Sequence, residues 1–122
     1  MRVRTGIDAV EIHRFRVALE RTPAMIDRLF TVSEVTSVSG RVESLAARFC
    51  VKEATMKLFG VGLGAVPFHD IETVRLETGQ PSLRLTGAAA TLALEQGCHE
   101  FALSLTHTRT LAIAQVVSLI EG

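Results

Sequence analysis

Two carboxylates and a lysine are the side chains of this sequence best suited to chemistry. With successive helical residues about 100° apart, Glu53 falls inside the apolar stripe of the helix expected at 42–59, where an unpaired carboxylate is costly. Asp8 follows the first expected strand, and two converging carboxylates are typical ligands of Mg2+, which also takes phosphate oxygens and water. Lys57, one turn after Glu53, would offset phosphate charge. A purely structural pair between Glu53 and Lys57 is the alternative.

The remaining candidate groups lack the spacing that other chemistries require. The four histidines show no metal-ligand spacing, which argues against a zinc site. Cys50 and Cys98 form no CxxC motif and are too few for a disulfide scaffold, so we expect two reduced, buried thiols. The glycines of "GVGLG" form neither a Walker loop nor a dinucleotide fingerprint, and we expect a loop with flexible joints there.

Length and composition limit the class of protein. A chain of 122 residues predicts a single domain, 1–122. Its 13 basic and 13 acidic residues cancel, so no overall charge favours nucleic acid or a membrane surface as partner. The hydrophobic fraction is 48%, yet no apolar run approaches the length of about 20 residues that spans a bilayer. We therefore expect surplus apolar surface to lie between subunits. The N-terminus lacks the features of a signal peptide, which predicts a cytoplasmic protein.

Helices and strands must position these side chains, and the sequence patterns predict where those elements lie. We expect a strand at 3–7, helices at 12–21, from 22 onward, from 31 onward and at 42–59, strands at 71–77 and 82–86, a helix at 87–97, and paired strands at 100–107 and 110–119. This order predicts an α+β fold, with a small, mostly antiparallel sheet and the long helix packed on it.

Capping residues mark several of the expected helix ends. Thr22 with Pro23 would open the second helix, and Thr86 would cap the helix at 87–97. Thr31 and Glu34 form a capping-box pattern. Glycines at 60 and 97 would end helices in left-handed turns.

Four segments together carry a resemblance to a known family. "GIDAVEIHRF", "LAARFCVKEATMKLFGVGLG", "DIETVRLETGQPSLRLTGAAATLA" and "FALSLTHTRTLAIAQVV" resemble, in the same order, the holo-[acyl-carrier-protein] synthases, the small phosphopantetheinyl transferases. "FCVKEATMK" is similar to the family motif "WAVKEAxxK", and "SLTH" to "SxSH". The resemblance implies the 4'-phosphopantetheinyl transferase fold and a homotrimer with active sites between subunits. It also implies Mg2+-dependent transfer of the 4'-phosphopantetheine arm of coenzyme A to a carrier-protein serine, with release of adenosine 3',5'-bisphosphate.

The resemblance also assigns expected roles to individual residues. Asp8 and Glu53 would share Mg2+ at the pyrophosphate of coenzyme A, with Lys57 on the same phosphates. Either a metal-bound water or Glu53 itself would take the serine proton. His107 would lie on the coenzyme A phosphate side, unless it is simply a histidine at a turn.

Arg48 points to a site shared between subunits. It lies five residues before Glu53 and so projects about 140° away from it on the same helix. If both bind coenzyme A, they serve different sites, with Arg48 holding the 3'-phosphate from a neighbouring subunit. An exposed, solvated arginine is the alternative.

The first helix and the segment after it offer a surface for the carrier protein. Arg14, Arg21 and Arg28, with Met25 and Ile26 nearby, form a basic and apolar patch. The carriers of this system, whether for fatty acid, polyketide or peptide synthesis, resemble small acidic helical bundles that such a patch would attract. A solvated basic face is the alternative.

Two other classes of function also remain for the whole protein: a binding module for coenzyme A or carrier protein without turnover, and a purely structural component.

Overall fold

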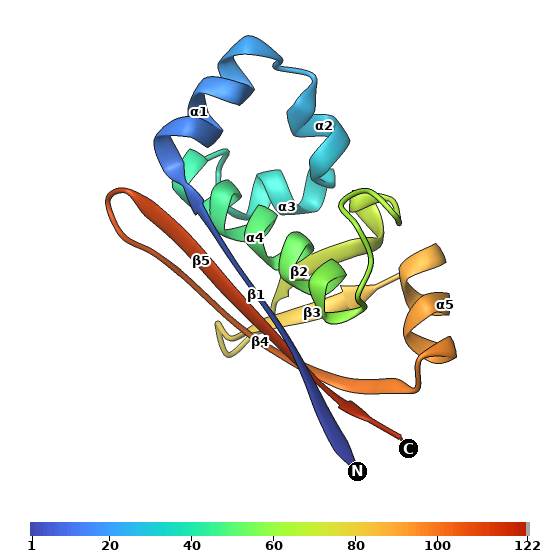
Figure 1. Ribbon diagram of the computed structural model, residues 1–122. Coiled ribbons are helices and arrows are strands. Elements are labelled where there is room, and N and C mark those ends of the chain that lie inside the picture. Colours follow the sequence, from blue (N-terminus) through green and yellow to red (C-terminus); the bar gives the residue numbers. More distant parts are fainter. Residues whose placement is uncertain (122) are drawn as a thin grey trace.

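The chain folds into two antiparallel sheets on either side of a long helix, α4 (Val42–Leu58), as the computed structural model of residues 1–121 shows (Figure 1). The other elements are β1 (Arg2–Glu11), α1 (Ile12–Arg21), α2 (Met25–Leu29), α3 (Val32–Ser37), the 3-10 turn η1 (Phe68–Asp70), β2 (Ile71–Arg75), β3 (Pro81–Leu85), α5 (Gly87–Glu95), β4 (Cys98–His107) and β5 (Leu111–Ile120). The α+β class and the antiparallel pairing are confirmed, but the strands divide into two sheets rather than one.

The larger sheet has the strand order β1-β5-β4, so the C-terminal strand is central and pairs with the first. Arg2 lies opposite Ile120, which brings both ends of the chain to one corner of the molecule (Figure 1). The β4–β5 hairpin predicted around residues 108–110 is confirmed. The smaller sheet is the β2–β3 hairpin, whose turn contains Gly79 with the left-handed φ of +88° that the sequence suggested.

Small residues allow α4 to lie very close to the larger sheet. The buried face of β5 beneath the helix contains Ala112 and Ala114. On β1, a Cβ atom at Gly6 would lie only 1.9 Å from the carbonyl oxygen of Ala54. Only glycine therefore fits at position 6. The close approach places β1 residue Asp8 next to the turn of α4 that carries Glu53.

The first strand is longer than the sequence pattern indicated. Asp8 was expected just past the strand's end, but β1 runs to Glu11 and pairs with β5 over its full length. Asp8 thus lies inside the strand, on the same face as Gly6, and is only 9% exposed. The reason is that the alternation of inward and outward residues continues beyond Ile7, with a carboxylate in an inward position.

Helix termini agree with the sequence in part. Thr31 and Glu34 form the capping box with both of its hydrogen bonds, and Gly60 and Gly97 adopt positive φ after α4 and α5. The predicted start of the second helix is wrong, since α2 begins at Met25 without a side-chain cap. Thr86 stands at the N-cap of α5, but its side chain makes no capping hydrogen bond.

A buried ion pair joins α3, α4 and the segment before β2. The Lys52 ammonium is 2.8 Å from Glu34 Oε1, and both side chains are at most 1% exposed. Lys52 also donates to the carbonyl oxygens of Phe68, the first residue of η1 (2.9 Å), and of Ile71, the first residue of β2. Burial lowers the pKa of Lys52, and Glu34 opposes that shift. No pattern in the sequence indicated this pair. Within residues 1–121, no helix combines the length and apolar character needed to cross a membrane.

Candidate active site

Asp8, Glu53 and Lys57 come together where β1 meets the second half of α4. Lys57 Nζ lies 2.9 Å from Asp8 Oδ1 and donates to the Ile7 carbonyl oxygen at 3.1 Å. The alternative of an ion pair between Lys57 and Glu53 is not observed, because Lys57 pairs with Asp8. The Lys57 side chain is 58% exposed and the Asp8 side chain 9%, so the lysine can turn toward a ligand while Asp8 stays in place. The convergence of Asp8 and Glu53 from distant parts of the sequence is as predicted.

Glu53 is half-buried at the edge of the helix face, not at its driest point as expected. The buried charged groups of α4 are instead Arg48 and Lys52, because α4 is covered on two sides. Burial, and after it the adjacent Asp8 carboxylate, raise the pKa of Glu53 to about 7, although Lys57 acts to lower it. Two acidic groups that disfavour each other's charge indicate a place for a cation.

The two carboxylates fit a hard divalent cation. Asp8 Oδ2 is buried and has no hydrogen-bond partner among the described residues, so its lone pairs are available to a cation. No group of three or more His, Cys, Asp or Glu side chains suited to a metal occurs in residues 1–121. A bound Mg2+ would therefore take its other ligands from phosphate oxygens and water, as this ion commonly does.

The loop after α4 forms a pocket next to these groups. Glu53 and Lys57 line it together with Met56 and the loop residues 61–63, and its volume is about 260 Å³. The "GVGLG" segment thus contributes to the site as a wall of the pocket. The nearby Cys50 is buried, and burial, aided by Asp8, raises its pKa to about 12, so its thiol stays protonated.

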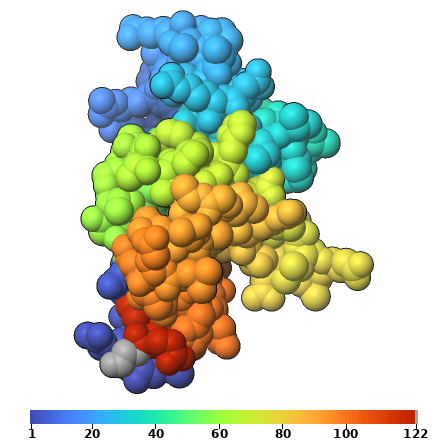
Figure 2. All heavy atoms as spheres, turned by 90° about the vertical axis from the view of Figure 1, so that its right-hand side faces the viewer, coloured from blue at the N-terminus to red at the C-terminus, as the bar shows by residue number. Residues whose placement is uncertain are grey.

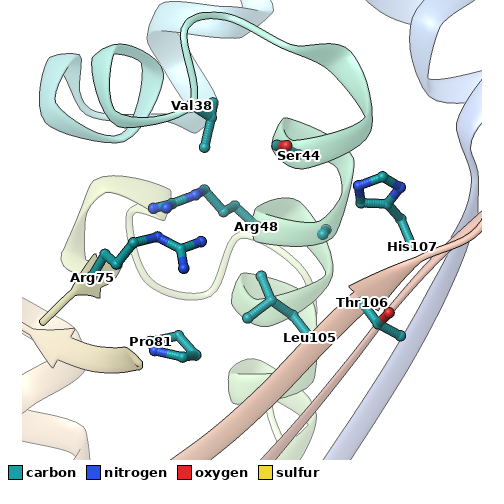
Figure 3. Close-up of a pocket in the computed structure, with 9 residues that line it drawn as sticks. Val38, Ser44, Arg48, Arg75, Pro81, Leu105, Thr106 and His107 are labelled. Carbon is teal, nitrogen blue, oxygen red and sulfur yellow. The ribbon is translucent and has the colours of Figure 1, made fainter. Parts of the chain in front are cut away.

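Arg48 and His107 lie in a second pocket, of about 200 Å³, whose lining includes neither Glu53 nor Lys57. Its lining residues come from α4, β2, β3, β4 and the segment before α4: Val38, Ser44, Ala47, Arg48, Arg75, Pro81, Leu105, Thr106 and His107 (Figure 3). The structure thus separates Arg48 from Glu53, as the helical angle indicated. It excludes the exposed, solvated arginine, because Arg48 is 2% exposed and donates to the Thr73 carbonyl oxygen at 2.7 Å.

The predicted carrier-binding residues lie on α1 and α2. Arg14 and Arg21 are exposed and line a shallow hollow on α1, and Arg28 and Met25 line an apolar pocket of about 240 Å³ that includes Phe49. Ile26, which follows Met25 in the sequence, is half-buried and packs against the core. Arg14 is 3.8 Å from Glu11, a long and exposed contact that leaves its charge largely available.

Two charged residues with special surroundings were missed from the sequence. Arg75 lines the pocket of Arg48, yet near a hairpin turn it reads as an ordinary surface arginine. Lys52 lies inside the "FCVKEATMK" segment, and its place in that segment was the available signal for a special role.

Comparisons with known proteins identify the family. The family model for the 4'-phosphopantetheinyl transferase superfamily matches residues 4–115. The holo-[acyl-carrier-protein] synthase of Streptomyces griseus subsp. griseus is 45% identical over 121 residues, covering 97% of this chain and 98% of the relative. That of Moorella thermoacetica is 42% identical over 120 residues, covering 96% and 92%.

Solved structures show the same fold. The Chronobacterium ammoniagenes ACPS–CoA complex matches with a TM-score of 0.89 and 28% identity, over 100% of both chains. The Helicobacter pylori holo-[acyl-carrier-protein] synthase in complex with coenzyme A matches with a TM-score of 0.85 and 27% identity, over 94% of this chain and 99% of the other.

Proposed function

Because this chain belongs to the holo-[acyl-carrier-protein] synthases of the 4'-phosphopantetheinyl transferase superfamily, we propose that it moves the 4'-phosphopantetheine arm of coenzyme A onto a serine of an apo carrier protein. Adenosine 3',5'-bisphosphate is the other product. The convergence of Asp8, Glu53 and Lys57 beside one pocket is the observation that supports this reaction best, since phosphoryl transfer requires charge neutralisation and positioning above all.

Asp8 and Glu53 are the proposed ligands of Mg2+, with the orphaned Asp8 Oδ2 and the raised pKa of Glu53 as support. When bound, the ion supplies charge neutralisation at the pyrophosphate of coenzyme A. The exposed Lys57 ammonium then adds a second positive charge on the same phosphates, and its contact with Asp8 fixes its starting position.

The transfer itself exchanges one phosphorus–oxygen bond for another. The carrier serine oxygen forms a bond to the pantetheine-side phosphorus, and the bond from that phosphorus to the bridging oxygen breaks, so that adenosine 3',5'-bisphosphate leaves. The serine proton must pass to a base, and the Glu53 carboxylate beside the pocket is one possible acceptor. A water molecule in the site is the alternative acceptor.

The second pocket supplies the 3'-phosphate site in this proposal. Arg48 and His107 provide positive charge there, away from the Glu53 pocket. Since Arg48 and Glu53 line different pockets of one chain, each coenzyme A in this proposal takes its metal site from one subunit and its 3'-phosphate site from a neighbour, as in a homotrimer with shared active sites. Exposed Val3, Ile7 and Leu111 on the larger sheet offer apolar surface for such contacts.

A mass measurement tests the proposal. The protein is incubated with an apo acyl carrier protein, coenzyme A and Mg2+, and the carrier mass should rise by one phosphopantetheine arm. A carrier whose acceptor serine is replaced by alanine is the control and should stay unmodified. Binding of coenzyme A without any mass increase, across fatty acid, polyketide and peptide carriers, would instead favour the binding-module alternative.

A further inference from the structure

The pocket of Arg48 contains a second arginine that neither the motifs nor the comparisons assign. Arg75 ends β2 and lines the same wall as Arg48. The two guanidinium groups point toward each other on one side of the pocket, and His107 lies on the other side (Figure 3). Ser44 and Thr106 add hydroxyl groups to the lining. The pocket therefore presents several hydrogen-bond donors and two permanent positive charges.

Nearby carboxylates balance the charge of the two arginines only in part. Within residues 1–121, neither Arg48 nor Arg75 is in a salt bridge. Glu34 and Glu72 raise the pKa of Arg48, but the Glu34 carboxylate is bonded to Lys52, and the Glu72 carboxylate accepts a hydrogen bond from the Thr31 hydroxyl. Arg75 acts in the opposite direction and lowers the pKa of Arg48, as does burial, the largest cause. An anion between the two guanidinium groups would relieve this repulsion.

Hydrogen bonds to the backbone hold both arginines in place. Arg48 Nη1 donates to Thr73 O at 2.7 Å, inside the core. Arg75 Nη1 donates to Gly79 O at 2.7 Å, in the turn of its own hairpin. That turn, residues 76–80, projects from the body of the molecule (yellow in Figure 2). Each guanidinium keeps further N–H groups for a ligand, and two such groups suit the several oxygens of a phosphate monoester.

We infer that Arg75 is a specificity-determining residue that binds the 3'-phosphate of coenzyme A together with Arg48. The inference rests on the proposed function and extends it from a site for coenzyme A to discrimination against coenzyme A that lacks the 3'-phosphate. A monoester dianion carries enough charge for two arginines, whereas the pyrophosphate is assigned to the Asp8–Glu53 pocket. Arg75 therefore binds the 3'-phosphate and does not touch the reacting phosphorus.

The test compares two nucleotides that differ only in this phosphate. Calorimetry measures binding of adenosine 3',5'-bisphosphate and of adenosine 5'-monophosphate to the parent chain, to Arg75→Gln and to Arg84→Gln. Arg84 is the matched control, because it is an exposed arginine on the neighbouring strand β3 and does not line the pocket.

We expect the parent and Arg84→Gln to prefer the bisphosphate equally. Arg75→Gln should reduce that preference about three- to tenfold, the range for an exposed charge-assisted contact, through weaker bisphosphate binding alone. In the transfer assay, Arg75→Gln should raise the KM for coenzyme A and leave the KM for dephospho-coenzyme A unchanged.

The failures of the two proposals are distinguishable. If the parent transfers phosphopantetheine and prefers the bisphosphate, but Arg75→Gln keeps the full preference, the assignment of Arg75 is wrong and the proposed function stands. If the parent chain neither transfers the arm nor distinguishes the two nucleotides, the proposed function and this inference both fail.

Discussion

Replacing Lys52 by methionine should destabilise the fold far more than a surface charge change does. Methionine has a similar length but no charge, so Lys52→Met leaves the Glu34 carboxylate buried without its cation, 2.8 Å from where Nζ was. It also leaves the carbonyl oxygens of Phe68 and Ile71 without their donor. Removal of one partner from a buried ion pair costs about 3–5 kcal/mol. That is a large share of the about 5–15 kcal/mol that stabilises a typical domain.

Urea unfolding at a fixed protein concentration measures this cost. With an m-value of about 2 kcal/mol/M, the midpoint should fall by about 2 M. The matched control is Arg16→Met, since Arg16 is also paired, with Glu43 at 3.0 Å, but the two side chains are 42% and 38% exposed. That exposed pair contributes at most about 1 kcal/mol, and its midpoint should hardly move.

A double variant shows whether the buried charge is the cause. Lys52→Met combined with Glu34→Gln leaves no buried charge, although the amide oxygen can accept from only one of the Thr31 and Thr73 backbone N–H groups, which now bond to separate carboxylate oxygens. The double variant should therefore recover part of the lost stability, and the coupling between the two sites should exceed about 1 kcal/mol. Equal midpoints for Lys52→Met and Arg16→Met, or no recovery in the double variant, would refute the reasoning.

Three further predictions concern the site. At pH 7 the Glu53 carboxyl, with a pKa of about 7, is partly protonated without a cation, so Mg2+ binding should release protons and its apparent affinity should rise with pH through this range. Calorimetry in buffers of different ionisation enthalpy measures this release, which Glu53→Gln should abolish. Replacing Arg14, Arg21 and Arg28 together by glutamate should raise the KM for the carrier and not that for coenzyme A, and added salt should weaken carrier use by the parent; equal carrier kinetics in variant and parent would place the docking surface elsewhere. If sites are shared between subunits, inactive Glu53→Gln chains mixed with inactive His107→Ala chains should regain activity, whereas no recovery after proven subunit exchange would count against sharing.

Local patterns predicted the fold well where one face of an element is buried. The stripe of Ile12, Phe15 and Leu19 gave α1, and all three side chains are buried as expected. The capping box at Thr31 also formed. The predicted length of β1 and the predicted start of α2 were wrong, because nothing in the local sequence argues against a shorter strand or an earlier helix start.

The candidate site was harder to predict because it depends on which sides of α4 are covered. A helical projection placed Glu53 in the apolar stripe, on the assumption of a single buried face. Since the second sheet covers α4 as well, the buried charges are Arg48 and Lys52, and Glu53 lies at an edge. The proposed role of Arg75 depends on β2 and α4 lining the same pocket, and residue spacing in the sequence does not indicate that arrangement.

The Mg2+ dependence of carrier modification in one pair of variants tests the central claim most directly. Initial rates are measured by mass spectrometry over a range of Mg2+ concentrations for the parent, for Glu53→Gln and for Glu43→Gln, a control on the same helix that pairs with Arg16 outside the site. The parent and Glu43→Gln should require Mg2+ and react alike. Glu53→Gln, folded by circular dichroism, should be slower by about a hundredfold or more, because several kcal/mol of charge stabilisation are lost. A Glu53→Gln rate equal to that of the parent, or full parent activity in excess chelator, would contradict a metal site formed by Asp8 and Glu53.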